Sequence, residues 1–147
     1  MSVRSVLCPI DFDGASDAAL KLAVDQAKAR DATLDLLHVW QPGAEYTPDE
    51  PPIPFSAKLP ENKIRADLLA LEVDLPAENV RCHVTCGTPS HDIVDMATKL
   101  DSELVVMGTH ARTGLRHWFV GSVCEWVLHH CPCPILVCRG PESKSDD

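Results

Sequence analysis

The sequence predicts an α/β protein with an open, five-stranded parallel sheet and helices on both faces. Three observations support this prediction. Short apolar runs alternate with helix-like segments along the chain, which is typical of βαβ units. The apolar runs are rich in Val, Ile and Leu, as expected for strands that are buried on both faces. A length of 147 residues suits one domain with a sizeable core.

The predicted elements follow one another regularly. Strands are expected at 3–10, 33–40, 79–86, 104–107 and 134–138, and helices at 18–30, 58–75, 91–100 and 121–130. Ser16 or Asp13 is the expected cap of the first helix, and Thr88 followed by Pro89 is a typical helix start. Residues 41–54 hold five prolines and are expected to form a loop, and the polar tail 141–147 is expected to be disordered.

Composition and charge exclude several classes of function. Thirteen basic and 22 acidic residues give a net charge of −9, which opposes binding to nucleic acid or an anionic membrane. The chain has neither a membrane-spanning apolar run nor a signal-like start, so we expect a cytoplasmic protein. Its seven cysteines are then expected to be reduced, with Cys8 and Cys138 buried as small apolar groups.

One stretch carries the chemistry of a phosphate site. In residues 104–125 an apolar run ends at Gly108, a basic loop with Arg112 and Arg116 follows, and Gly121 and Ser122 open a helix. Glycine lets a ligand approach the main chain closely. The first N–H groups of a helix lack internal partners and favour an anion. The alternative is that these glycines only serve the turns.

The spacing Gly108-x2-Ala111-x9-Gly121-Ser122 resembles the G-x2-G-x9-G-(S/T) signature of the universal stress protein family. The segments VLCPIDF (6–12), LHV (37–39) and CPCPILV (131–137) extend the resemblance over nearly the whole chain. It implies one family domain over residues 1–140 with a Rossmann-like, adenine nucleotide alpha hydrolase-like fold and strand order 3-2-1-4-5. Strands 1 and 4 are then neighbours where the order reverses, so Asp11 and Gly108 should meet at one crevice.

The resemblance also implies a ligand and its contacts. The ligand is an adenine nucleotide, expected to be ATP, alone or with magnesium. Asp11 would contact the ribose, the base or a divalent ion, and its alternative role is that of a turn carboxylate. Phosphates and ribose would be held by Gly108, Ala111, Arg112, Gly121, Ser122, Val123 and Cys124, and adenine would lie near Pro9, Ile10, Val39 and Met107.

Ala111 departs from the family pattern, because it stands where the second glycine is expected. If that position needs a positive φ, alanine costs about 1 kcal/mol or more. If it needs only clearance, one methyl group is tolerated. The expected effect is weaker binding rather than none.

The sequence favours a binding protein over an enzyme. It has no G-x4-G-K-[ST] pattern and no evident in-line base, and His110 and His117 are its only loop candidates for acid–base chemistry. We therefore expect slow ATP hydrolysis at most, and a role as a sensor or regulator in the stress response.

Two alternatives come from other classes of function. The run His129-His130-Cys131-Pro132-Cys133, with Cys82-x3-Cys86 elsewhere, suggests a metal or redox sensor, although it also reads as a helix end stopped by prolines. The second alternative is a homodimeric interaction protein that does not bind nucleotide. The strand Ile135 to Cys138 is the expected dimer edge, with Trp118, Phe119 and Trp126 either in the core or covering the partner.

Overall fold

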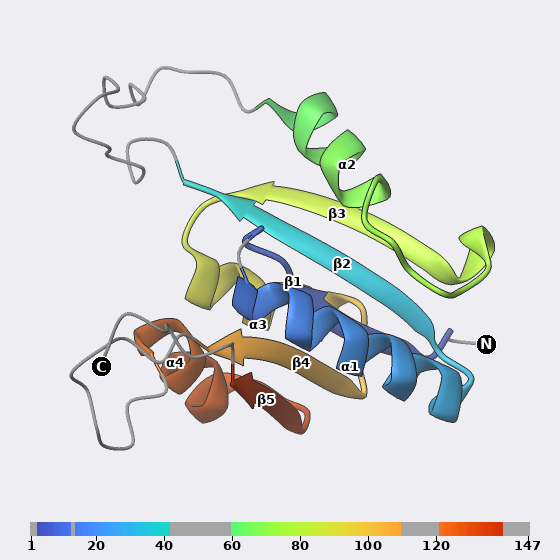
Figure 1. The fold of residues 1–147 in the computed structure, drawn as a ribbon. Helices are drawn as coiled ribbons and strands as arrows, with labels where there is room; N and C mark the ends of the chain where they lie inside the picture. The colour runs from blue at the N-terminus through green and yellow to red at the C-terminus, as the bar shows by residue number, and fades with distance from the viewer. Residues whose placement is uncertain (1–2, 13, 42–59, 110–120, 140–147) are drawn as a thin grey trace, which may run out of the picture.

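A computed structural model describes residues 3–12, 14–41, 60–109 and 121–139. Five strands alternate with four α-helices, as the sequence predicts (Figure 1). In chain order they are β1 (Ser5–Pro9), α1 (Gly14–Arg30), β2 (Thr33–Trp40), α2 (Glu61–Leu69), the 3-10 turn η1 (Ala77–Asn79), β3 (Val80–Cys86), α3 (Pro89–Lys99), β4 (Leu104–Thr109), α4 (Ser122–His130) and β5 (Ile135–Arg139).

The strands form one parallel sheet in the order β3-β2-β1-β4-β5, which confirms the predicted topology. β1 pairs with β2 through all five of its residues, from Ser5↔Thr33 to Pro9↔Leu37. β2 pairs with β3 over seven residues and β4 with β5 over five. β1 is the central strand. From it, β2 and β3 are added on one side and β4 and β5 on the other, so the strand order reverses between β1 and β4.

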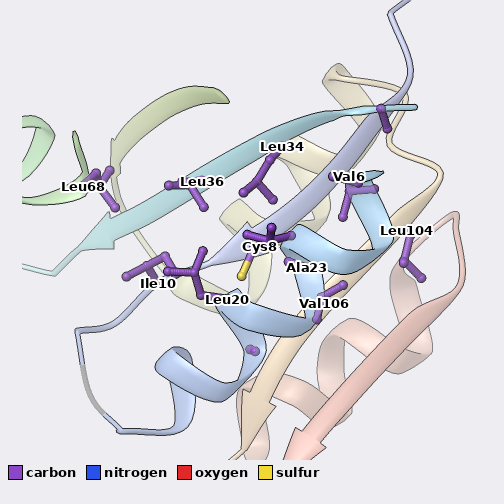
Figure 2. Close-up of a cluster of buried hydrophobic side chains, with 14 of the residues drawn as sticks. Val6, Cys8, Ile10, Leu20, Ala23, Leu34, Leu36, Leu68, Leu104 and Val106 are labelled. Atoms are coloured by element: carbon purple, nitrogen blue, oxygen red, sulfur yellow. The ribbon is translucent and has the colours of Figure 1, made fainter. Parts of the chain in front are cut away.

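Helices cover both faces of the sheet (Figure 1). α1 and α2 pack on one face, where Val6, Cys8 and Ile10 join a cluster with Leu20 of α1 (Figure 2). α3 and α4 pack on the other face, around Leu7 and its neighbours. Val6, Leu7 and Cys8 are completely buried, so β1 is covered from both sides.

Several predicted element ends differ from the structure by one or more residues, and three of them bear on the core or the candidate site. α2 stops at Leu69 instead of residue 75, because Leu71, Val73 and Leu75 alternate with exposed residues and pack in an irregular segment against the α1 side of the core. α1 begins at Gly14, so Ser16 lies inside the helix and is not its cap.

The third wrong end is that of β4, which continues through Gly108 to Thr109 because these residues pair with Cys138 and Arg139. Thr88 is the N-cap residue of α3 and Pro89 follows it, as predicted, but the Thr88 side chain makes no capping hydrogen bond.

Several other expectations lie outside the described residues. These are the capping role of Asp13, the loop from residue 42 onward and the tail 141–147. Over the ranges that the structure covers, no helix is long and apolar enough to cross a membrane.

A buried carboxylate ties the amino-terminal halves of three strands together. Asp35 of β2 is completely buried and accepts hydrogen bonds from Ser5 of β1 (2.6 Å) and from Arg81 of β3 at both oxygens (2.7 and 2.9 Å). His83 Nε2 lies 2.8 Å from the same carboxylate. Burial alone would raise the pKa of Asp35, but the hydrogen bonds from His83, Arg81 and Ser5 outweigh it and hold that pKa below its ordinary value.

Asp35→Asn is expected to lower the free energy of unfolding at pH 7 by about 2 to 3 kcal/mol, because one neutral amide cannot accept from all these donors. The stabilising contribution of Asp35 is present above its unfolded pKa and is lost as the pH falls through the lower folded-state pKa. The wild type should therefore lose more stability than Asp35→Asn on acidification. Urea unfolding of both proteins across acidic pH measures this.

Glu103→Gln is the matched control, since Glu103 pairs with Arg4 and Arg30 at the protein surface. Such exposed pairs contribute about 1 kcal/mol or less. Equal losses at pH 7 for Asp35→Asn and Glu103→Gln would contradict the assigned role of Asp35.

Candidate functional site

The candidate site begins where β1 and β4 cease to pair. Their ladder consists of Val6↔Leu104 and Leu7↔Val105, whereas β1 ends at Pro9 and β4 at Thr109. Pro9 has no N–H to continue the pairing. In a doubly wound sheet, the crevice at this reversal of strand order is the general place for a ligand. The structure therefore brings the ends of these two strands, nearly a hundred residues apart in sequence, to one edge of the molecule.

Gly121 connects this edge to α4. It has a φ of 91°, a conformation that side-chain-bearing residues rarely adopt. A Cβ at this position would lie 3.7 Å from Thr109 Oγ1, so the start of α4 lies against the end of β4. Gly121 thus supplies, at the start of α4, a backbone conformation that other residues rarely adopt, and its contact with a ligand stays a prediction.

The first turn of α4 presents N–H groups that the helix itself does not use. Glu125 N donates to Gly121 O (2.9 Å) and is the first intrahelical donor. The N–H groups of Ser122, Val123 and Cys124 precede it and have no acceptor within the helix. Ser122 is exposed, whereas the Cys124 side chain is buried in the core, so Cys124 can offer a ligand only its main chain.

Asp11 lies at the end of β1 and is tied to the first turn of α1. Its carboxylate accepts a hydrogen bond from Ser16 Oγ, and Ser16 Oγ accepts one from the Asp11 N–H (3.2 Å). The alternative role of Asp11 as a turn carboxylate is therefore seen directly. A ligand contact by Asp11 stays a prediction.

The residues predicted around adenine fall on both faces of the sheet. The Ile10 side chain belongs to the cluster under α1, whereas Val39 and Met107 belong to the cluster under α3 and α4. The Ile10 N–H donates to Leu37 O (2.8 Å), and the Ile10 carbonyl lies 2.7 Å from His38 Nδ1. Ile10 thus makes internal contacts through its side chain and main chain, and its contact with a base stays a prediction.

Phe12 and His38 also lie at this edge, although the sequence reasoning did not select them. Phe12 is exposed and has a φ of 65°, which is unusual for a bulky residue and is a feature that clusters at functional sites. Its ring centroid lies 5.0 Å from that of His38. The sequence does show an aromatic residue, Phe12, directly after Asp11 at the end of the strand. The positive φ of Phe12 cannot be predicted from the sequence.

Other predicted residues lie outside the described ranges. This group includes Ala111, which departs from the family signature, and the neighbouring Arg112. The group also includes His110, Arg116, His117, Trp118 and Phe119.

The His/Cys run at the end of α4 does not gather around a common point. The rings of His129 and His130 have centroids 6.5 Å apart and are nearly perpendicular, and the His130 ring stacks on Trp126 at 3.8 Å. Within the described ranges, no three His, Cys, Asp or Glu residues are arranged to hold a metal ion. Cys131 and Cys133 do lie together, with their sulfurs 3.6 Å apart.

A groove on the α3 side of the sheet is separate from the switch point. It is lined by Thr85, Asp92, Asp95, Met96 and Lys99. Thr85 Oγ1 donates to Asp92 Oδ2 (2.8 Å), so the carboxylate nearest to the strand is held by the protein itself.

The parallel sheet, the helices on both of its faces and the reversal of strand order between β1 and β4 define a doubly wound α/β protein. The sequence matches the model of the Universal stress protein family over residues 2–139, and the chain belongs to this family. Universal stress protein A homolog 1 of Coxiella burnetii (strain RSA 493 / Nine Mile phase I) is 31% identical over 141 residues, covering 92% of this chain and 96% of that protein.

Solved structures share the fold. Universal stress protein UspA from Lactobacillus plantarum aligns with a TM-score of 0.64 at 25% identity, over 95% of this chain and 99% of that chain. A universal stress protein from Archaeoglobus fulgidus in complex with dAMP aligns with a TM-score of 0.62 at 22% identity, over 93% and 98%. A universal stress protein in complex with cAMP aligns with a TM-score of 0.59 at 21% identity, over 96% and 100%.

Gly121→Ala is expected to lower the free energy of unfolding by about 1 kcal/mol or more, because alanine at positive φ is strained even without a clash. Ser122→Ala, one residue further on, is the matched control and should change stability by less than about 0.5 kcal/mol. Urea unfolding without ligand compares the two. Wild-type stability for Gly121→Ala would show that the positive φ is not required at the start of α4.

Proposed function

We propose that this protein binds an adenine nucleotide, with ATP as the expected ligand, in the crevice between β1 and β4. Nucleotide occupancy then acts as the signal of a sensor or regulator in the stress response. The observation that carries this proposal is that the β1–β4 ladder ends at Leu7 and Val105, while Gly121, at φ 91°, places the start of α4 against the end of β4.

The phosphate end of the proposed site is the start of α4. The N–H groups of Ser122, Val123 and Cys124 and the positive end of the helix dipole favour an anion there. Gly121 leaves the approach to these groups clear of a side chain, since an added Cβ would meet only Thr109 Oγ1 within 4 Å among the described atoms. The exposed Ser122 hydroxyl adds a donor. Arg112 and Ala111 are proposed contacts of the same phosphates.

The base end of the proposed site lies along the ends of β1 and β2. Pro9, Val39 and Met107 supply apolar surface on the α3 side of the sheet, and Gly108 supplies main chain beside it. Asp11 is the proposed polar contact to the ribose or base, alongside its observed bonds to Ser16. Magnesium, where bound, would be held by the Asp11 carboxylate and would offset the negative charge of the phosphates.

The complexes of family members with dAMP and cAMP support an adenine ring as the common ligand feature. The described residues around the crevice fit a nucleotide, because they offer an apolar surface next to unpaired main-chain donors. The proposed protein hydrolyses ATP slowly at most. A cytoplasmic location is part of the same proposal.

A second copy of the chain is the proposed partner of β5. This strand lies at the end of the sheet order and pairs with β4 on one side. Ile135, Leu136, Val137 and Cys138 are all half-buried. An apolar edge of this kind favours pairing with another strand. A homodimer formed there leaves the β1–β4 crevice on each copy accessible, because two strands of the sheet order separate β1 from that edge.

Thermal unfolding of nucleotide-stripped protein tests the proposal. ATP with magnesium at a hundred times its Kd should stabilise the fold by about 2.7 kcal/mol, which is a shift of several degrees in Tm for a domain of this size. GTP at the same concentration should give a smaller shift. A protein that forms a dimer but shows no shift with ATP would instead be the interaction protein of the second alternative.

Ser122→Ala should weaken ATP binding by about fivefold to tenfold, as expected for the loss of one hydrogen bond of about 1 to 1.4 kcal/mol. Its control is Ser90→Ala, which removes a hydroxyl from the first turn of α3 instead of α4. Calorimetric titration of the three proteins with ATP gives the affinities. Equal affinity for Ser122→Ala and wild type would place the phosphates elsewhere.

A further inference from the structure

Two thiols meet at the junction of α4 and β5. Cys131 is the C-cap residue of α4, and its N–H donates to Val127 O (2.8 Å). Cys133 follows after Pro132, and its sulfur lies 3.6 Å from that of Cys131. Both residues are half-buried and pack against the cluster under α3 and α4. The two sulfurs are therefore in direct contact and held by ordered structure on both sides.

The local backbone explains why the sulfurs converge. Cys131 is extended, with φ −74° and ψ 137°, and side chains two residues apart in an extended chain point to the same side. Pro132 restricts its own φ, and Pro134 disfavours a helical conformation at Cys133. A disulfide has an S–S length of about 2.05 Å, so the two sulfurs, now 3.6 Å apart, must move about 1.5 Å closer to form one.

The other five cysteines, all among the described residues, make no such sulfur contact. Cys138 is half-buried on β5 and not buried as predicted. Cys8 and Cys124 are buried, and burial raises the pKa of both thiols. Cys82 and Cys86 lie four residues apart on β3, which is roughly 13 Å along a strand. All seven cysteines lie within the described residues and are free thiols. Among them, the sulfurs of Cys131 and Cys133 are in contact.

We propose that Cys131 and Cys133 form a reversible dithiol–disulfide couple that exchanges with a small-molecule disulfide of the glutathione type. The Cys131 thiolate attacks one sulfur of oxidised glutathione, forms a mixed disulfide and releases one glutathione thiolate. Cys133 then loses its proton and attacks the Cys131 sulfur, which forms the internal disulfide and releases the second glutathione. The protein gives up two electrons and two protons, and two glutathione thiols carry them away.

The order of attack follows from the environment of the two thiols. Burial, together with the contact to Cys131, raises the pKa of Cys133 to about 12. Cys133 therefore stays a thiol at neutral pH, and Cys131 is the attacking sulfur. The position of the couple also gives it a structural consequence, because its oxidation would link the end of α4 to the segment that enters β5.

The test incubates the reduced full-length protein with reduced and oxidised glutathione at pH 8 and then blocks free thiols by alkylation. Tandem mass spectrometry is expected to show loss of alkylation at Cys131 and Cys133 together, with a mass lower by two hydrogens. In Cys133→Ser the second step is blocked, so the mixed disulfide at Cys131 should rise about tenfold over wild type.

The double variant Cys82→Ser with Cys86→Ser is the matched control and should keep the Cys131–Cys133 disulfide at the wild-type level. The proposal is overturned if Cys131 and Cys133 stay fully alkylated in oxidised glutathione. It is also overturned if the wild type accumulates stable mixed disulfides at these positions without the internal bond. Because the readout contains no nucleotide, failure of this proposal is distinct from failure of nucleotide binding.

Discussion

The structure depends on the burial of β1 from both sides and both edges. Val6, Leu7 and Cys8 are completely buried, with α1 over one face, α3 and α4 over the other, β2 along one edge and β4 along the other. A parallel strand in this position is mostly apolar, and its neighbours arrive through crossovers that cover both faces. The reversal of strand order at β1 is the direct result, and it creates the edge where the candidate site lies.

The two ends of the sheet differ in how their strands are held together. At the amino-terminal side, Asp35 collects donors from Ser5, Arg81 and His83 and fixes β1, β2 and β3 to one another. At the carboxyl-terminal side, β1 and β4 stop pairing after Leu7 and Val105. In doubly wound proteins, ligands generally bind at the carboxyl ends of the strands where the strand order reverses, and the candidate site lies there.

The sequence was sufficient for the topology but not for the local detail of the site. Alternation of apolar runs with helical segments and the family signature led to the correct strand order. The predicted helix 58–75 extends too far, because Leu71, Val73 and Leu75 follow the two-residue period of an extended chain. Over so few residues this period is hard to distinguish from that of a helix. Hydrogen-bonded pairing of Gly108 and the positive φ of Phe12 depend on neighbours that are distant in sequence. The glycine at the start of α4 is predictable, because the spacing of Gly121 from Gly108 belongs to a motif in which glycine lets a ligand approach the main chain.

Hydrogen exchange measured by mass spectrometry, with and without ATP and magnesium, tests most directly whether the separate segments form one nucleotide site. The account predicts slower exchange in three stretches together, namely the end of β1 with Phe12, the end of β4 with Thr109, and the first turn of α4 from Ser122. Exchange in α2 and in the amino-terminal half of β3 should not change. Protection confined to the groove beside Thr85 and Asp92, or protection at one of the three stretches alone, would contradict a shared site at the β1–β4 crevice.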